Sequence, residues 1–483
     1  MKHYDVVIIG AGTAGLSARK EVAKKTDNYI VVDDGPLGTT CARVGCMPSK
    51  VLIQVANDFD RRKKMEQMGI LGGNQLSVDS ALVMTHVRAL RDRFVKGVKS
   101  PMAAWSDKLI PKRAQFKDLH TLEIGGELVK ADKIIIATGS RPVLPVEWLP
   151  YQDFLIDTDS FFELPELPQA VAVIGLGVIG VEIGQALHKL GVKVIGVTVG
   201  KAIGGLSDPA LQDYVAQKLS AEMPVYFTGA TLVGKTSAGK IQVSADGTVF
   251  EVDKIIATVG RRANVDKLGL QNLGISLDKK GMPDVDSNTM KLKQAPHIFL
   301  PGDANGDRAI LHEAADEGVI AGYNAVNEEQ CFRRRTPMAI TFSEPNIAVV
   351  GKHYSQLKND QDSFVTGKVS FEGQGRSIVK LKEQGLLHIY ADNPTGTILG
   401  AELQSPDGEH LAHLIAWAIS LKLTVFEALK LPFYHPVIEE GLRTALRDAA
   451  LQLALQLDLQ LDLQLDNGEH KFELLRCVDA PIR

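Results

Sequence analysis

Near its start the chain has the pattern of a βαβ unit: a strand, a glycine-rich turn, a helix and a second strand. The strands are expected at 4–9 and 29–32, and the turn after the first strand holds Gly10, Gly12 and Gly15. In this pattern the first glycine permits the turn, the second lets the backbone approach a pyrophosphate, and the third lets the helix pack on the strand. The N-terminus of the helix offers unpaired N–H groups to the phosphates. The segment therefore predicts a dinucleotide site.

An acid at the end of the second strand strengthens this interpretation. Asp33 lies eighteen residues after Gly15, where a carboxylate can accept a hydrogen bond from a ribose hydroxyl. A glycine-rich turn alone could be a flexible loop. The strand, the helix and the acid together favour dinucleotide binding.

The same pattern returns at 170–199, which predicts a second dinucleotide site. Its turn holds Gly175, Gly177 and Gly180. No acid ends its second strand, which continues through Thr198 to Lys201, and no arginine cluster is present there for a 2′-phosphate. The loop leaves NAD and NADP as alternatives.

Further strands that end in small-residue turns follow each copy. They are expected at 133–140, 254–261 and 297–303, the last ahead of a helix from about Leu311. A proline-rich stretch at 141–168 is interpreted as a linker. From Pro337 onward strands and amphipathic helices alternate without a nucleotide turn, which predicts a separate domain.

Two cysteines five positions apart, Cys41 and Cys46, are expected at or just before the first turns of a helix. Such a pair can close a small disulfide ring, and the helix dipole would stabilise a thiolate there. Zinc binding is the alternative, but Cys331 and Cys477 are isolated and look like poor partners for a four-ligand site. Two unrelated buried thiols are the third interpretation. We expect a redox pair and no metal.

Near the C-terminus His435 precedes Glu440 by five residues. A carboxylate beside an imidazole raises its basicity, so this is a candidate acid/base pair. Many surface helices carry the same spacing without function. The pair gains weight from the cysteines, because thiol–disulfide exchange needs a proton acceptor.

Composition narrows the function classes. The 483 residues are 45% hydrophobic and 23% charged with a formal net charge of -4, which gives no basic field for nucleic acid. No apolar run reaches the roughly 18 residues of a membrane span, and the strand expected at 4–9 leaves no room for a signal peptide. We expect a cytoplasmic protein with neither a membrane nor a nucleic acid as partner.

Between Ala450 and Asp466 leucine occupies every odd position from 451 to 465. A period of two predicts a one-sided strand. We expect this tail to pack against the preceding domain, although an expanded repeat without function is an equal alternative.

In this order, the motifs resemble those of the pyridine-nucleotide disulfide oxidoreductases of the glutathione reductase and lipoamide dehydrogenase type, over about residues 4–450. The resemblance implies a glutathione reductase-like α/β fold, with two Rossmann-like dinucleotide-binding domains and a C-terminal α+β dimerisation domain. It also implies bound FAD, NAD or NADP, and a homodimer. The implied parts are an FAD-binding domain at 1–150 and 269–336, an NAD(P)-binding domain at 151–268, an interface domain at 337–450 and a tail at 451–483.

The resemblance assigns roles to the redox residues. Cys46 would be the thiol nearest the flavin and Cys41 the interchange thiol that attacks substrate. His435 would be the base, oriented by Glu440, and would reach the disulfide of the other subunit. Lys50 would lie beside the flavin.

It also assigns the cofactor-binding residues. Asp303 would hold the ribityl chain of the flavin, and Glu182 would pair with Lys50. The other residues expected at the two nucleotides are Gly10, Gly12, Gly15, Asp33, Thr138, Gly139 and Gly302 for FAD, and Gly175, Gly177, Gly180, Gly260 and Arg261 for the second site.

Within the family, Pro-Ser-Lys after Cys46 resembles the dihydrolipoamide dehydrogenase branch and the mercuric reductases, and the helix at 311–318 resembles that of the dehydrogenase branch. Several residues depart from that branch: Thr39 for Gly, Arg43 for Asn, Thr198 for the ribose-binding acid, Val437 for Thr and Glu439 for Ser. The expected activity is oxidation of dihydrolipoamide, free or on a carrier domain, by NAD⁺. The alternatives are an NADPH-dependent reductase of a disulfide or metal ion and, less favoured by the intact redox residues, a scaffold without activity.

Overall fold

The computed structural model describes residues 1–360 and 363–456. Its chain divides into two compact units. Unit 1 comprises Met1–Leu52, Asp79–Leu167 and Val259–Arg334, and unit 2 comprises Ile53–Val78, Pro168–Thr258 and the chain from Arg335 onward. The five-part division drawn from the sequence stays a prediction.

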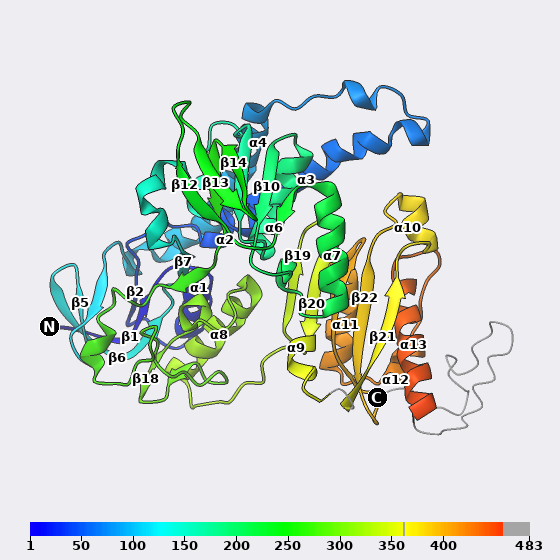
Figure 1. Ribbon diagram of the computed structural model, residues 1–483. Coiled ribbons are helices and arrows are strands. Elements are labelled where there is room, and N and C mark those ends of the chain that lie inside the picture. Colours follow the sequence, from blue (N-terminus) through cyan, green and yellow to red (C-terminus); the bar gives the residue numbers. More distant parts are fainter. Residues whose placement is uncertain (361–362, 457–483) are drawn as a thin grey trace. The chain divides into compact units, whose positions relative to one another are not determined.

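Unit 1 is built on an eight-stranded sheet, visible around β1 and β2 in Figure 1. Its main path is β17-β18-β6-β1-β2-β3, and β5 pairs with both β6 and β4. Strands β18, β6, β1, β2 and β3 run parallel, as a nucleotide-binding βαβ fold requires. The strands are β1 (Lys2–Ile9), β2 (Tyr29–Val32), β3 (Leu109–Ile110), β4 (Ala114–Phe116), β5 (Thr121–Ile124), β6 (Glu127–Ile136), β17 (Lys291–Leu292) and β18 (Ala295–Phe299).

Both faces of this sheet are buried, which explains why its central strands are continuously apolar. Along β1, Val7 and Ile9 enter one hydrophobic cluster, whereas Val6 and Ile8 enter another, with residues of α1 (Thr13–Val22) and α8 (Leu311–Val326). The expected strands 4–9 and 29–32 are confirmed, and the helix predicted from Leu311 begins there. Helix α1 ends at Val22, where the chain tightens into a turn.

The proline-rich stretch 141–168 is not a linker. It forms β7 (Ser140–Pro142), paired with β16 (Arg261–Ala263), then η5 (Val146–Phe154), β8 (Leu155–Ile156) and α5 (Thr158–Phe161). Trp148, Phe161 and Phe162 in this stretch are buried. The prolines keep its elements short, but these aromatic residues supply enough apolar surface to fold it into unit 1.

The first part of unit 2 repeats the parallel βαβ pattern. Four of its strands follow the order β11-β10-β9-β15, all parallel, and a three-stranded antiparallel sheet, β12-β13-β14, is separate. The elements are β9 (Ala170–Ile174), α6 (Val178–Lys189), β10 (Lys193–Val197), α7 (Pro209–Glu222), β11 (Val225–Tyr226), β12 (Thr231–Lys235), β13 (Ile241–Ala245), β14 (Thr248–Val252) and β15 (Lys254–Ala257).

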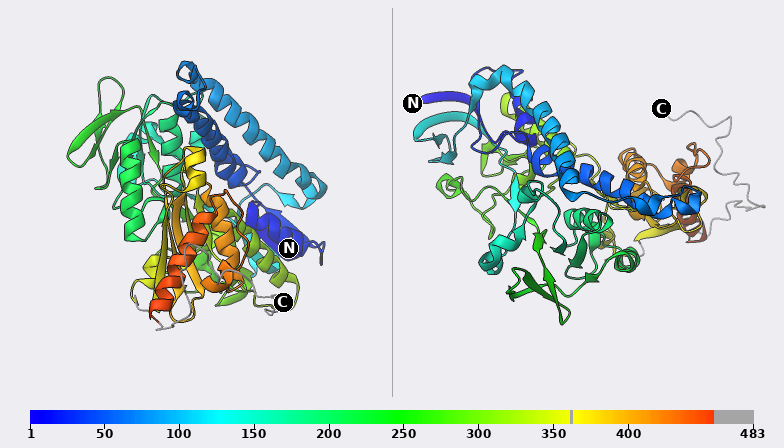
Figure 2. Two further views of the ribbon diagram at one scale, coloured as in Figure 1. Left: turned by 90° about the vertical axis from the view of Figure 1, so that its right-hand side faces the viewer. Right: turned by 90° about the horizontal axis from the view of Figure 1, so that it is seen from above.

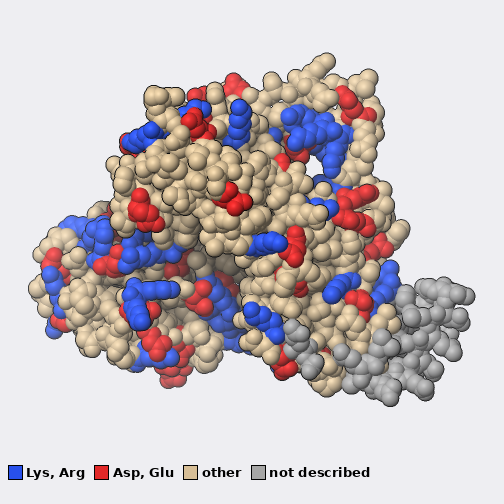
Figure 3. Space-filling model, viewed as in Figure 1, with Lys and Arg blue, Asp and Glu red and all other residues tan. Residues whose placement is uncertain are grey.

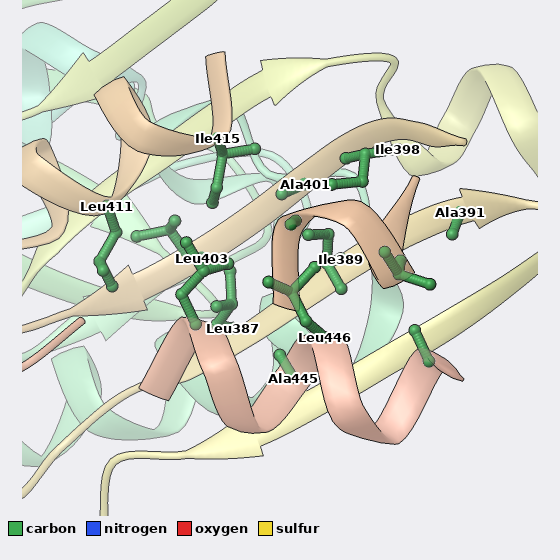
Figure 4. Packing of buried hydrophobic residues seen from close by; sticks show 14 of the residues in the cluster. Leu387, Ile389, Ala391, Ile398, Ala401, Leu403, Leu411, Ile415, Ala445 and Leu446 are labelled. Atoms are coloured by element: carbon green, nitrogen blue, oxygen red, sulfur yellow. The ribbon is translucent and has the colours of Figure 1, made fainter. Parts of the chain in front are cut away.

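From β19 onward unit 2 changes to a five-stranded antiparallel sheet in the order β19-β20-β23-β22-β21. Helices α11 and α13 lie against its strands (Figure 2), and their buried leucines and alanines interdigitate with those of β22 and β23 (Figure 4). The elements are β19 (Met338–Thr341), β20 (Asn346–Gly351), α9 (Tyr354–Leu357), β21 (Phe364–Ser370), α10 (Gly375–Lys380), β22 (Leu386–Asp392), β23 (Ile398–Ser405), α11 (Gly408–Ser420), α12 (Val425–Leu429) and α13 (Glu440–Gln456).

The leucine-alternating tail is not a strand where the structure describes it, because α13 continues to Gln456. Leucine, alanine and glutamine are strong helix formers. Ala445, Ala449 and Leu453 recur every four residues and are buried against the sheet. A Cβ on Gly367 of β21 would lie 2.1 Å from the Ala445 carbonyl oxygen, so the glycine lets helix and strand touch. Thus Leu453 does pack in the domain core, and the remainder of the predicted tail lies outside the described residues.

Acidic and basic side chains are mixed over the face drawn in Figure 3. Among the described residues, no helix combines the length and the apolar character needed to cross a membrane.

Candidate functional site

The first glycine-rich turn joins β1 to α1 with the geometry that a phosphate-binding turn needs. Gly10 has φ +109°, and a Cβ there would lie 2.3 Å from the Ala137 carbonyl oxygen. A Cβ on Gly15 would lie 1.9 Å from the Gly10 carbonyl oxygen, so Gly15 lets α1 start directly beneath the turn. Gly12 is the N-cap of α1 and has open space beside it. The N–H groups of this helix end are therefore approachable by a phosphate.

Asp33 lies at the end of β2, as predicted, and is already part of this turn. Its Oδ2 accepts a hydrogen bond from the Ala11 N–H at 2.5 Å, and its Oδ1 accepts one from the Gly35 N–H at 2.7 Å. The carboxylate therefore ties the end of β2 to the glycine-rich turn. The sequence predicts a bond from Asp33 to a ribose hydroxyl, but it does not predict this bond to the turn.

Asp303, which is expected at the flavin, belongs to a hydrogen-bonded group within unit 1. The Ser140 hydroxyl donates to Asp303 Oδ2 at 2.7 Å, and Arg261 Nε donates to Ser140 Oγ at 2.8 Å. Arg261 was assigned to the second nucleotide on the sequence, yet its described contacts are with Ser140. Ser140 itself was missed, because a serine after Thr-Gly has no signal of its own.

These residues fit a bound FAD. The Thr138 hydroxyl is buried and has no hydrogen-bond partner among the described residues. Its backbone carbonyl and that of Gly139 are both bonded to Asn264, at 3.0 and 2.9 Å. An unpaired buried hydroxyl costs free energy unless a ligand bonds to it. Together with the open helix end at Gly12, it supports the assignment of this region to FAD.

The second glycine-rich turn, between β9 and α6, repeats the first. Gly175 has φ +96°, a Cβ on Gly180 would lie 1.8 Å from the Gly175 carbonyl oxygen, and Gly177 has open space beside it. Thr258 adds a bond that the first turn lacks, donating from its hydroxyl to the Gly175 carbonyl at 2.6 Å. Thr198 follows β10 at the place where an acid would bind ribose.

The two cysteines lie as predicted at helix starts. Cys41 is the second residue of α2 (Thr40–Val44) and Cys46 the first of α3 (Cys46–Asp60). Both are thiols that form no disulfide, Cys41 half-buried and Cys46 exposed. The hydrogen bond to Cys46 and burial raise the pKa of the Cys41 thiol, and Lys50 opposes this rise. In the dithiol, therefore, the neighbouring Cys46 and burial oppose ionisation of Cys41, whereas Lys50 favours it.

The residue ahead of the cysteines is strained. Thr39 has φ 61° and ψ 148°, a region that residues with a Cβ rarely occupy. Its hydroxyl accepts a hydrogen bond from the Ala42 N–H at 3.3 Å. Threonine in place of glycine at this position therefore strains the backbone, but its hydroxyl supplies one helix-capping hydrogen bond.

No metal cluster accompanies the cysteines: the described residues hold no group of three or more His, Cys, Asp or Glu that could bind an ion.

His435 and Glu440 form the predicted pair within unit 2. The His435 Nδ1 lies 3.0 Å from Glu440 Oε1 and 3.1 Å from its Oε2, and the Val437 N–H donates to Oε2 at 3.2 Å. Burial tends to raise the pKa of Glu440, but the bonds from His435 and Val437 outweigh it, so this pKa is lowered. An ionised Glu440 accepts from Nδ1–H and leaves Nε2 as the basic nitrogen. The imidazole is 80% exposed and can reach a substrate.

Two expected contacts stay predictions: that of the cysteines with His435, and that of Lys50 with Glu182. The cysteines belong to unit 1 and His435 to unit 2, and the resemblance places them together across two subunits. Lys50 and Glu182 are likewise in different units. The Glu182 carboxylate is buried and accepts from the Phe342 N–H at 2.9 Å.

A dithiol in the same unit as a dinucleotide turn can exchange an electron pair with a bound nucleotide. The fold and the site thus define the class of nucleotide-dependent dithiol oxidoreductases. Within that class, the chain belongs to the pyridine nucleotide-disulphide oxidoreductase family, whose model matches residues 4–318; the dimerisation domain of the same family matches residues 337–446. Members bind FAD and use NAD(P)H.

Individual relatives agree with this assignment. Dihydrolipoyl dehydrogenase of Bacillus subtilis is 27% identical over 449 residues, covering 91% of this chain and 97% of the relative. Mercuric reductase of Lysinibacillus sphaericus is 27% identical over 455 residues, covering 92% and 82%. The Cu(II) complex of the HOCl-induced flavoprotein disulfide reductase RclA from Escherichia coli has a similar fold, with a TM-score of 0.80, 21% identity and coverage of 94% and 100%.

Proposed function

We propose that this flavoprotein disulfide oxidoreductase is a dihydrolipoyl dehydrogenase that oxidises dihydrolipoamide with NAD⁺ through Cys41 and Cys46. The observation that carries the proposal is that one chain holds both a dithiol at two helix starts and an exposed histidine oriented by a carboxylate. The dihydrolipoyl dehydrogenase relatives, which match over nine-tenths of the chain, support the choice of substrate.

In the first half-reaction Cys41 and Cys46 begin as a disulfide. His435 Nε2 takes the proton of one substrate thiol, and the thiolate attacks Cys41 Sγ, which breaks the disulfide and releases Cys46 as a thiolate. The second substrate thiol then attacks the substrate sulfur bound to Cys41, and its proton passes to the Cys41 sulfur as that thiol leaves. Lipoamide leaves with a closed disulfide, and the protein holds both electrons as a dithiol.

Glu440 keeps His435 ready for this step. Its lowered pKa means that the carboxylate is ionised at neutral pH, so Nδ1 keeps its proton and Nε2 is free to accept one. The ion pair also stabilises the imidazolium that forms.

In the second half-reaction the dithiol is reoxidised. The chemistry that FAD supplies when bound is the transfer of this electron pair to NAD⁺. Thr138, Asp303 and the helix end at Gly12 would hold it in unit 1, and the turn at Gly175–Gly180 would hold the nicotinamide nucleotide. One proton is released for each hydride that NAD⁺ accepts.

The dimerisation domain supports a homodimer. In it we place His435 of one subunit beside the cysteines of the other, so that each site needs both copies. We also propose a cytoplasmic location for the protein, a reducing compartment in which structural disulfides are rare.

The second candidate is an NADPH-dependent reductase of a disulfide or a metal ion. The observation that favours it is the end of β10, where Thr198 replaces an acid and the Lys201 ammonium, 2.6 Å from Asp213 Oδ1, could exchange this exposed partner for a 2′-phosphate. The mercuric reductase relative supports the same candidate.

The test is reduction of NAD⁺ and, separately, of NADP⁺ by dihydrolipoamide with the purified holoenzyme. Cys41→Ser is expected to abolish turnover, and Cys331→Ser, at an exposed cysteine, is the matched control that should retain it. Turnover of NAD⁺ that Cys41→Ser abolishes supports the dehydrogenase. NADPH-driven reduction of another disulfide or a metal ion, without dihydrolipoamide oxidation, contradicts it.

A further inference from the structure

Helix α8 carries two buried carboxylates that share one guanidinium. Glu313 and Glu317 are 2% and 0% exposed. Arg334 Nη2 donates to Glu313 Oε2 and to Glu317 Oε1, both at 2.6 Å. Arg308 Nη1 donates to Glu313 Oε1 at 2.9 Å. Glu313 therefore has two cationic partners, whereas Glu317 shares one.

The remaining oxygen of Glu317 is bonded to the turn that carries Asp303. Glu317 Oε2 accepts from the Gly302 N–H at 2.6 Å and from Asn305 Nδ2 at 2.7 Å. Gly302 has φ +76°, and a Cβ there would lie 3.0 Å from Ala14 Cβ of α1. The turn is thus pressed against the first nucleotide-binding helix on one side and bonded to Glu317 on the other.

The backbone of α8 is fixed against that same helix. A Cβ on Gly318 would lie 2.2 Å from the Ala14 carbonyl oxygen, and one on Gly322 would lie 2.5 Å from that of Ala18. These two glycines let α8 and α1 touch along their backbones. Because Glu317 directly precedes Gly318, its carboxylate is held at a set position relative to the start of α1.

The electrostatics separate the two carboxylates. Burial raises the pKa of Glu313, but the bonds from Arg334 and Arg308 outweigh it and the pKa is lowered. Burial raises the pKa of Glu317, and Arg334 and the bonds from the turn do not offset it. A buried carboxylate whose charge is only partly compensated contributes little to the stability of the fold. A role in holding the turn therefore accounts better for the presence of Glu317 at this buried position.

We propose that Glu317 is a positioning residue of the FAD site: anchored by Arg334, it holds the Gly302–Asp303 turn so that Asp303 meets the ribityl chain of the flavin. The proposal rests on FAD binding by the family and on the role expected for Asp303. It does not depend on which dithiol or disulfide is the substrate.

The experiment compares Glu317→Ala with Glu313→Ala. Both remove a buried carboxylate from α8 and from Arg334, but Glu313 does not bond to the turn among the described residues. The apoprotein of each is reconstituted with FAD, and the Kd, the flavin absorption spectrum and the Tm are measured. We expect both to lower the Tm, and Glu317→Ala alone to raise the Kd of FAD, by roughly tenfold or more, and to alter the flavin spectrum.

The conservative variant Glu317→Gln should restore most of the FAD affinity, because an amide oxygen still accepts from Gly302 and Asn305. Equal effects of Glu317→Ala and Glu313→Ala on the Kd, or no effect of Glu317→Ala, would overturn the proposal. If Glu317→Ala does not fold, Asn305→Ala serves in its place: it removes one bond of the turn to Glu317, a rise in Kd of about threefold is expected, and an unchanged Kd overturns the proposal.

The same measurements separate this proposal from the proposed function. A wild-type protein that binds FAD but does not oxidise dihydrolipoamide contradicts the substrate assignment and leaves the role of Glu317 open to the Kd comparison. A wild-type protein that turns over, with equal FAD affinity in the two alanine variants, removes the role of Glu317 alone.

Discussion

The two glycine-rich turns have nearly the same backbone and different surroundings. Gly10 and Gly175 have φ +109° and +96°, and a Cβ on the third glycine of either turn would lie within 2 Å of the first glycine's carbonyl oxygen. After β2, however, Asp33 is bonded to the turn at Ala11, whereas after β10 the chain continues through Thr198 without an acid. The comparison indicates that the glycines set the shape of the turn, and we propose that the end of the second strand decides which nucleotide each turn binds.

The largest effect is expected where a side chain would collide with backbone. Gly15→Ala and Gly180→Ala each place a Cβ within 2 Å of a carbonyl oxygen, and each should lower the free energy of unfolding by about 3 kcal/mol. Urea unfolding monitored by circular dichroism measures this loss. Equal stability to wild type would contradict the close contact of helix and turn at that site.

A smaller effect, on binding alone, is expected at the middle glycines. The Cβ that Gly12→Ala or Gly177→Ala adds has no neighbouring atom within 4 Å, so the free energy of unfolding should stay unchanged. The added methyl group should nevertheless block the approach of a pyrophosphate. We expect Gly12→Ala to weaken FAD binding and Gly177→Ala to weaken nicotinamide nucleotide binding, each by roughly 2 kcal/mol, or about thirtyfold in Kd. Titration of each ligand into each variant measures this, and the variant at the other turn is the control. Loss of both ligands in one variant would show that the two turns do not act independently.

The preference for NAD⁺ or NADP⁺ should depend on the residues that follow β10. Thr198→Glu supplies the missing acid, which can accept from a ribose 2′-hydroxyl and repels a 2′-phosphate. We expect the ratio of the Kd values for NADP⁺ and NAD⁺ to rise about tenfold, as measured by calorimetry, and Lys201→Ala to shift it in the same direction by less. An unchanged ratio in both variants would place the specificity outside this loop.

The smallest effect is expected at Thr39, which lies between β2 and the cysteines. Thr39→Gly removes the backbone strain at φ 61° and also the capping bond to Ala42, so a net stabilisation of about 1 kcal/mol is expected. Thr39→Ala keeps the strain and loses the cap, and it should destabilise. Thermal unfolding of the two variants against wild type separates strain from capping; a destabilised glycine variant would show that the cap outweighs the strain.

The parts predicted from sequence are those determined by neighbouring residues. Gly10, Gly12 and Gly15 lie within six positions, and their spacing carries the turn, the helix start and the phosphate site together. Cys41 and Cys46, and His435 and Glu440, are likewise close in sequence, and each pair has the geometry expected of it.

Predictions failed where distant residues decide the outcome. The period of two after Ala450 favours a strand, but as far as Gln456 the chain is a helix. Its Ala445, Ala449 and Leu453 are buried against the sheet, and Gly367 of β21 lets Ala445 approach closely. The prolines of 141–168 suggested a linker, but Phe161 and Phe162 are buried in the folded chain.

The sequence by itself determined the family, the two glycine-rich turns and the placement of the two cysteines at helix starts, because each depends on residue types at short fixed spacings. Only the tertiary structure decided that Ser140 joins Arg261 to Asp303, 163 residues further on, and that Glu317 joins Arg334 to the turn at Gly302. The physical reason is that a buried hydrogen bond depends on which groups folding brings together and removes from water, and no local pattern of residues records that.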